Sequence, residues 1–426
     1  MSIPVSREER RALLAAAGSY FFLLCGYYML RPIRDALAIQ SGARNNFELF
    51  LVVFAVSAVL LVPYWALVRS TPRGRLLWYV SVLFSLVFVA LFVGLRMAPD
   101  DGRIAFAYFV ALSSANYLLI SVFWSTMADL WRPEFAKRFY GYVAAGGSAG
   151  ALLGPFIVTV TVRDIGPAPL ILVACALVLC SAAMATLARD FLRRSPLGAA
   201  VPDGAIPVGG RAFEDLRRLA GTPYLLGIAG LLIVGQVIGA FMYSEQQKYA
   251  AGAFDTAADR AAFFGNMEIA VNLLALFFQA VVVTWLTRRG SLTLSLSAMP
   301  ALVGASFVVM ALFPIASVFL ATQVLRRASD YGLGKPPREM LFTVINPESK
   351  FKSKSLIDTV MQRGSDAFGQ WIYLFVAPLG LAGLSWLGAG LCVVLFGVTR
   401  VLGRAFETRR GEEAKAEART NANAPA

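Results

Sequence analysis

The feature that most constrains this chain is a succession of apolar segments, each about as long as a helix that crosses a membrane. The hydrocarbon core of a bilayer is roughly 30 Å thick and takes about 20 apolar residues of helix. Twelve such segments can be counted, and hydrophobic residues make up 58% of the 426 residues. Charged residues make up only 15%, against about 25% in soluble proteins. The pattern predicts an all-α integral membrane protein and excludes a water-soluble enzyme.

The twelve segments form two groups of six, which predicts two six-helix bundles over residues 1–190 and 223–404. The predicted spans lie near residues 13–37, 47–68, 76–97, 104–129, 139–162, 168–187, 224–243, 261–286, 292–312, 315–339, 356–377 and 379–402. Between the bundles, residues 191–222 read as a cytoplasmic linker, and apolar residues at helical spacing near its end predict a short amphipathic helix. The polar residues 405–426 are expected to form a disordered cytoplasmic tail.

The basic residues predict the orientation of these spans. Lys and Arg number 39 against 26 Asp and Glu, a net charge of +13. With the N-terminus inside, most of the Lys and Arg fall in cytoplasmic segments, as they do in membrane proteins generally. We therefore expect both termini in the cytoplasm and the chain in a bacterial inner membrane. Because topology accounts for the basic excess, no nucleic-acid partner is predicted.

Several kinds of chemistry have no residues to support them. The chain has no histidine, which removes histidine-based catalytic triads and proton relays. Its four cysteines lie in apolar runs and read as packing residues. Gly332-Leu-Gly-Lys335 is followed by Pro336 rather than Ser or Thr, so it does not match a phosphate-binding loop. We expect no catalytic residue, metal or cofactor, and any transport would draw on gradients or exchange.

The two halves repeat each other at an offset near 214 residues. Arg132-Pro-Glu134 corresponds to Asn346-Pro-Glu348, and Gly147-Ser148 corresponds to Gly364-Ser365. Two six-span repeats with cytoplasmic ends are the plan of the major facilitator fold. Secondary transporters built in this way hold their substrate near the bilayer midplane, between the repeats.

Charged residues inside the predicted spans are the main site candidates, because an Arg, Lys or Asp at the bilayer centre costs about 2.5–3.5 kcal/mol. Arg31 and Arg34 share a helix face near the end of the first span. Glu245 and Lys248 occupy the matching place in the seventh span. The alternative is that both clusters lie at the membrane edge and reach water.

The tenth and eleventh spans add further charges, which are Arg326, Arg327, Asp330, Asp358, Arg363 and Asp366. We predict Arg363 as the central anion contact, because it lies within a span beside small residues. Asp366 shares its helix face three residues on and would be its resting partner, displaced by an incoming phosphate. The alternative is a set of salt bridges that only fixes helix packing.

The substrate-binding candidates are Arg34, Glu245, Lys248, Arg326, Arg327 and Arg363, and the gating candidates are Arg31, Lys137, Arg138, Asp330, Asp358 and Asp366. Arg31 and Glu245 are expected to form an outer gate. Lys137 and Arg138, at a repeated inner junction, are expected to close the inner face by contacting acidic residues or helix C-termini.

Four stretches of sequence resemble the ATP/ADP translocase family, a branch of the major facilitator superfamily. The strongest reads SDYGLGKPPREM over residues 329–340 and continues as PESKFKSKSLID over residues 347–358. The others are Leu30-Arg-Pro-Ile-Arg-Asp35, Phe123-Trp124 with residues 136–140, and Glu245 with Lys248. The resemblance touches six of the twelve predicted spans.

This resemblance implies a function. The family's nucleotide exchangers use a Lys in span one, a Glu in span seven and a Lys in span eleven. Arg34 and Glu245 match the first two, and Arg363 is the cation nearest to the third. The resemblance implies a monomeric secondary transporter that moves a nucleotide or a related phosphorylated anion by alternating access, with ATP/ADP exchange as one form. The alternatives are a facilitator-type carrier or exporter of a non-nucleotide solute, and a non-transporting receptor or partner protein in the same fold.

Overall fold

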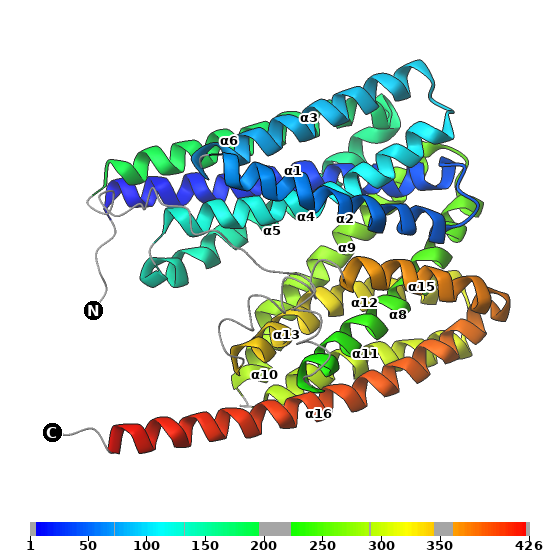
Figure 1. Cartoon of the computed structure of the whole chain (residues 1–426). Coiled ribbons are helices and arrows are strands. Elements are labelled where there is room, and N and C mark those ends of the chain that lie inside the picture. Colours follow the sequence, from blue (N-terminus) through cyan, green and yellow to red (C-terminus); the bar gives the residue numbers. More distant parts are fainter. Residues whose placement is uncertain are drawn as a thin grey trace. The chain divides into compact units, whose positions relative to one another are not determined.

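The computed structural model describes residues 6–71, 73–131, 133–195, 223–288, 291–344 and 361–422 (Figure 1). Every element assigned within these ranges is helical. The chain divides into two compact units. Unit 1 comprises Met1–Val208 together with Gln247–Asn272, and unit 2 comprises Gly209–Gln246 together with Leu273–Ala426.

Unit 1 is built from six long helices and a later segment of the chain. The helices are α1 (Arg7–Gln40), α2 (Asn46–Ser70), α3 (Arg73–Met97), α4 (Gly102–Leu130), α5 (Pro133–Ile165) and α6 (Pro167–Arg193). Helix α1 begins with a capping box, in which Ser6 and Glu9 satisfy each other's backbone N–H groups. The later segment consists of the end of α8 (Pro223–Ala253) and most of α9 (Ala257–Phe277).

Glycines allow α5 to lie against α1 in unit 1. Gly146, Gly150 and Gly154 recur every fourth residue, and a Cβ at these positions would overlap the carbonyl oxygens of Ala17, Phe21 and Cys25 of α1, respectively. Close approach through small residues is a common way for helices to associate in membranes. The stripe therefore packs α5 directly against the backbone of α1 from Ala17 to Cys25, in the part of α1 that precedes Arg31.

Unit 2 begins with most of α8 and continues with further helices, most of which are shorter than those of unit 1. They are η2 (Phe278–Val283), α10 (Thr284–Arg288), α11 (Leu292–Leu312), α12 (Ala316–Ser329), η3 (Asp330–Gly334), α13 (Lys335–Leu341), η4 (Phe342–Val344), α15 (Gln362–Val376), η6 (Ala377–Leu379) and α16 (Gly380–Ala422). η2 and η3 are π-helical. The two approach each other where Gly332 faces Phe278, and Gln279 Nε2 donates a hydrogen bond to the Tyr331 carbonyl at 3.1 Å.

Ten helices of the described residues are long and apolar enough to cross a membrane, against the twelve spans expected. The expected eleventh and twelfth spans both fall in the stretch Gln362–Gly411, which counts as one of the ten although the turn at Ala377–Leu379 and the positive φ of Gly380 separate α15 from α16. The expected tenth span forms α12, η3 and α13 and is absent from the ten because Arg326, Arg327 and Asp330 lie near its middle. The chain is a multi-pass integral membrane protein, while twelve spans and cytoplasmic termini remain predictions.

The structure bears differently on the expected linker and on the expected C-terminal tail. The linker, with its amphipathic helix, lies almost wholly outside the described residues. The tail expected to be disordered instead continues α16 as helix to Ala422. Its Ala, Glu, Lys and Arg residues are good helix formers, which explains the difference. The division into two six-helix bundles stays a prediction, and in the structure Gln247–Asn272 packs with unit 1.

Candidate functional site

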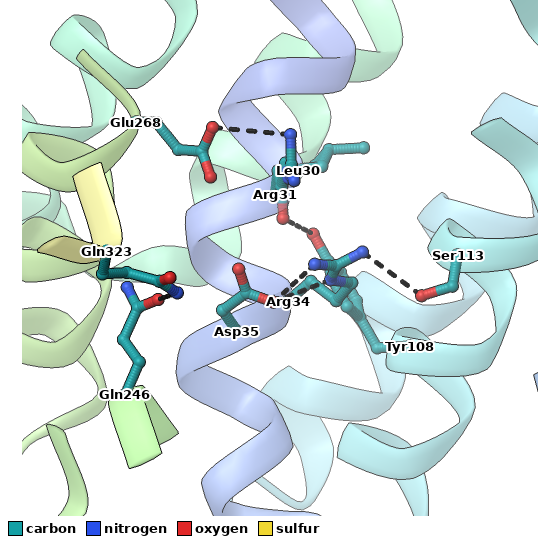
Figure 2. Close-up of polar contacts among 9 residues, drawn as sticks. All are labelled: Leu30, Arg31, Arg34, Asp35, Tyr108, Ser113, Gln246, Glu268 and Gln323. Atoms are coloured by element: carbon teal, nitrogen blue, oxygen red, sulfur yellow. Dashed lines mark hydrogen bonds and ion pairs between the residues drawn. The ribbon is translucent and has the colours of Figure 1, made fainter. Parts of the chain in front are cut away.

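The first group of charged side chains surrounds the second half of α1 in unit 1 (Figure 2). Arg34 Nη2 lies 2.6 Å from Asp35 Oδ1, and its Nε donates to the same oxygen at 2.9 Å. Nη1 donates to Ser113 Oγ of α4 at 3.3 Å, and the guanidinium stacks over the Phe109 ring. The adjacent Asp35 therefore neutralises the charge of Arg34 inside the unit.

Arg31 pairs with a residue from a distant part of the sequence. Its Nη1 lies 3.5 Å from Oε2 of Glu268 on α9, and the Glu268 side chain is 1% exposed. Helix α1 continues beyond Arg31 to Gln40, so Arg31 lies about 13 Å from the helix end at ~1.5 Å per residue. Arg31 and Arg34 are thus largely enclosed by unit 1 and matched by carboxylates, whereas their depth in the membrane stays a prediction.

The second group lies in unit 2 and centres on Arg326 of α12. Gln246 of α8 accepts a hydrogen bond from Gln323 Nε2 at 2.6 Å, and Gln323 Oε1 in turn accepts from Arg326 Nε at 3.1 Å (Figure 2 shows the first of these bonds). Both glutamines are buried. Within the described part of the chain, Arg326 forms no ion pair, so a buried chain of neutral amides positions its guanidinium.

Two further contacts in unit 2 involve candidate residues. Arg363 Nη1 lies 3.5 Å from Asp366 Oδ2, as the spacing of three predicts. Tyr373 of α15 donates a hydrogen bond to Glu245 of α8. Arg363 is therefore already matched by a carboxylate, which Arg326 is not.

The other candidates are less well placed. Lys248 is exposed on α8 and belongs to unit 1. Arg327 follows Arg326 in the last turn of α12 and is half-buried. Asp358 and the side chains of Lys137 and Arg138 lie outside the described residues. An Arg31–Glu245 gate stays a prediction, since the contacts described for these two residues are with Glu268 and Tyr373.

Two residues that matter to the geometry, Gln246 and Gln323, are missing from the predicted set. A third, Glu268, is only a lesser candidate on sequence grounds, as an acidic residue in an apolar segment. Gln323 lies three residues before Arg326, which places both on one helix face. Gln246 has no comparable signal, because its partner lies 77 residues away.

Comparison with known proteins gives one full-length relative. No protein-family model matches the chain. "ADP,ATP carrier protein 1" of Chlamydia trachomatis serovar D is 23% identical over 441 aligned positions, which cover 87% of this chain and 82% of that protein. The match thus extends well beyond the motifs that carry the resemblance.

Solved transporter structures share the fold. A POT family transporter in complex with a thioalcohol-conjugated peptide aligns with a TM-score of 0.64 at 13% identity, covering 93% of this chain and 96% of that one. A bacterial homologue of the iron transporter ferroportin, in an inward-facing state, aligns at 0.62 with 15% identity, covering 94% and 100%. The chain is therefore related to the ATP/ADP translocase family, as its motifs predict, and is a membrane protein of the major-facilitator type of fold.

Proposed function

We propose that the chain is a secondary transporter that carries a phosphorylated anion of the nucleotide class across a bacterial inner membrane by alternating access. Arg326 is its main phosphate contact. The observation that carries the proposal is the polar chain from Gln246 through Gln323 to Arg326, because it holds a cation inside unit 2 with only a neutral partner. The relatedness to an ADP,ATP carrier supports the nucleotide class.

The geometry of Arg326 suits a phosphate. Gln323 occupies Nε, so Nη1 and Nη2 are left to donate parallel hydrogen bonds, and bidentate donation is the strength of arginine over lysine. The neighbouring helix α8 has Gly239 at this level, where a Cβ would lie 3.3 Å from Arg326 Nη1. Glycine there keeps space beside the guanidinium that a larger side chain would fill.

The other arginines take secondary roles in this proposal. Arg34 and Arg363 are each matched by an aspartate in the structure, so an anion must displace a carboxylate before it can bind them. Breaking such a pair inside a protein is costly. An arriving phosphate therefore engages Arg326 first, and exchange of the Arg363–Asp366 contact follows as a second step.

The test is uptake by the full chain reconstituted in liposomes. Vesicles loaded with unlabelled ATP or ADP are offered labelled nucleotides, and a parallel panel offers non-nucleotide phosphates and neutral solutes. We expect nucleotide uptake that Arg326→Gln abolishes and Arg326→Lys weakens by at least about tenfold, because lysine lacks the planar fork. Arg400→Gln is the matched control, since Arg400 is exposed on α16.

Other results would replace the proposal. Uptake confined to non-nucleotide solutes would favour the facilitator-type carrier. Uptake of no solute by a folded, correctly inserted protein would favour the receptor or partner role. Normal nucleotide uptake by Arg326→Gln would keep the transport function but move the phosphate contact elsewhere.

A further inference from the structure

A pocket inside unit 2 combines cationic, amide and apolar groups. It lies among α8, α11, α15, α16 and the η3–α13 segment, and its empty volume is about 620 Å³ with its open mouth included. The polar groups that line it are Asp330, Lys335, Arg338, Gln236, Gln362 and Thr399, and the remaining lining is mostly leucine, methionine and proline. Arg326 does not line it, although Gln236 of the lining lies close to the Gly239 position that faces Arg326 Nη1, so the two cationic sites are neighbours with different residues.

The charges of the pocket leave a positive surplus. Asp330 is the one carboxylate that lines the pocket, against the two cations Lys335 and Arg338. Lys335 is exposed at the rim, with its Nζ 4.7 Å from the centre of the Tyr331 ring. Arg338 is half-buried and forms no ion pair with any residue that the structure describes. Two cations therefore share this space with a single aspartate, and no carboxylate of the described residues forms an ion pair with either cation.

The pocket is also amphipathic, and it extends from near one end of the helices towards their middle, with Gln236 13 residues after the start of α8. Leu296 is four residues, or about 6 Å, from the start of α11. Leu296, Leu232 and Pro300 are buried and form an apolar wall, while the cations lie towards the rim. In the predicted topology this end of unit 2 faces the cytoplasm, where basic pockets between helices commonly hold lipid phosphates.

From these features we propose that the pocket is a second anion site, which binds a phosphate group through Lys335 and Arg338. The glutamine amides can donate further hydrogen bonds, and the apolar wall accommodates whatever the phosphate carries. The phosphate can come from the headgroup of an anionic lipid or from a soluble phosphate compound. This binding does not depend on which solute the protein transports.

The experiment measures binding by the purified full chain rather than transport. Inorganic phosphate and pyrophosphate are titrated in a thermal-shift assay, since a ligand of the folded state raises the melting temperature. Phosphatidylglycerol retained by the protein, with phosphatidylcholine as reference, is counted by native mass spectrometry. We expect Lys335→Gln combined with Arg338→Gln to weaken phosphate binding about tenfold or more, because charged hydrogen bonds are the stronger kind.

A second pair of variants leaves every charge in place. A Cβ on Gly235, which lines the pocket, meets no heavy atom within 4 Å, so Gly235→Leu projects into the space. Gly230 is equally unobstructed on the same helix but does not line the pocket. We expect Gly235→Leu to abolish binding and Gly230→Leu to leave it unchanged.

The outcomes separate the sources and can overturn the site. Retention of phosphatidylglycerol alone identifies a lipid headgroup, and a thermal shift with phosphate or pyrophosphate alone identifies a soluble ligand. Either result supports the pocket as the binding site if Gly235→Leu abolishes that binding. Binding that survives Gly235→Leu, that is lost only in Arg326→Gln, or that the unaltered chain does not show with any probe would refute the proposal.

Discussion

Arg31 of α1 and Glu268 of α9 form an ion pair between two helices of unit 1, with Nη1 3.5 Å from Oε2 and side chains that are 17% and 1% exposed. Both residues lie well inside their helices, so neither charge can be hydrated as it would be on a surface. A carboxylate and a guanidinium buried together are tolerated because each offsets the desolvation of the other.

Removing one partner of this pair should lower the free energy of unfolding more than removing both partners together. Glu268→Gln or Arg31→Gln leaves an unmatched buried charge, and the free energy of unfolding should fall by about 3–5 kcal/mol. The loss of unfolding free energy in the double variant should be smaller than the losses of the two single variants added together. Thermal and denaturant unfolding in detergent measures this as a double-mutant cycle. Additive losses would mean that the two residues do not interact.

The glycine stripe of α5 should be intolerant of the smallest side chain. A Cβ at Gly150 would overlap the Phe21 carbonyl oxygen of α1, and a backbone atom cannot move aside as a side chain can. Gly150→Ala should therefore lower the melting temperature clearly, whereas Gly141→Ala on the same helix meets nothing within 4 Å and should not. Equal melting temperatures for the two variants would contradict the packing of α1 against α5.

Gln323 should act by positioning Arg326. Gln323→Leu keeps every charge but removes the hydrogen bond to Arg326 Nε and leaves the Gln246 amide oxygen without its donor. We expect nucleotide affinity to fall about tenfold, in line with the loss of one or two buried hydrogen bonds. Gln323→Glu is the informative companion, since its carboxylate would neutralise Arg326 and should weaken binding further. Binding that responds equally to both variants would argue against a role for the charge of Arg326.

Removing the carboxylate of the Arg363–Asp366 pair should raise nucleotide affinity, whereas the Gln323 variants should lower it. Asp366→Asn removes the carboxylate that lies 3.5 Å from Arg363 and makes the surroundings of the guanidinium more positive, which favours an anion. Equilibrium binding of the nucleotide should become tighter, and the rate of transport should fall if the pair must re-form to release the substrate. Arg363→Gln should have a smaller effect on affinity than Arg326→Gln. A larger effect would restore Arg363 as the main phosphate contact.

The sequence by itself determined that this is a helical membrane protein and which family it resembles, because both depend on local composition and on motifs. It also determined contacts within one helix. Arg363 and Asp366 lie three residues apart, and helical periodicity alone places them on one face. The helix expected over residues 315–339 is present as α12, η3 and α13, but its π-helical segment at Asp330 changes which residues share a face, and α-helical periodicity does not predict that change.

Only the tertiary structure decided which charges meet between helices. Arg31 and Arg34 share a face of α1, yet one contacts Glu268 on α9 and the other contacts Asp35 and Ser113. The choice depends on how far each neighbouring helix is rotated and shifted against α1, which small residues and side-chain packing set. For the same reason, the sequence singled out Arg363 as the central anion contact, whereas the packing places Arg34 and Arg363 beside aspartates and Arg326 beside the amide of Gln323.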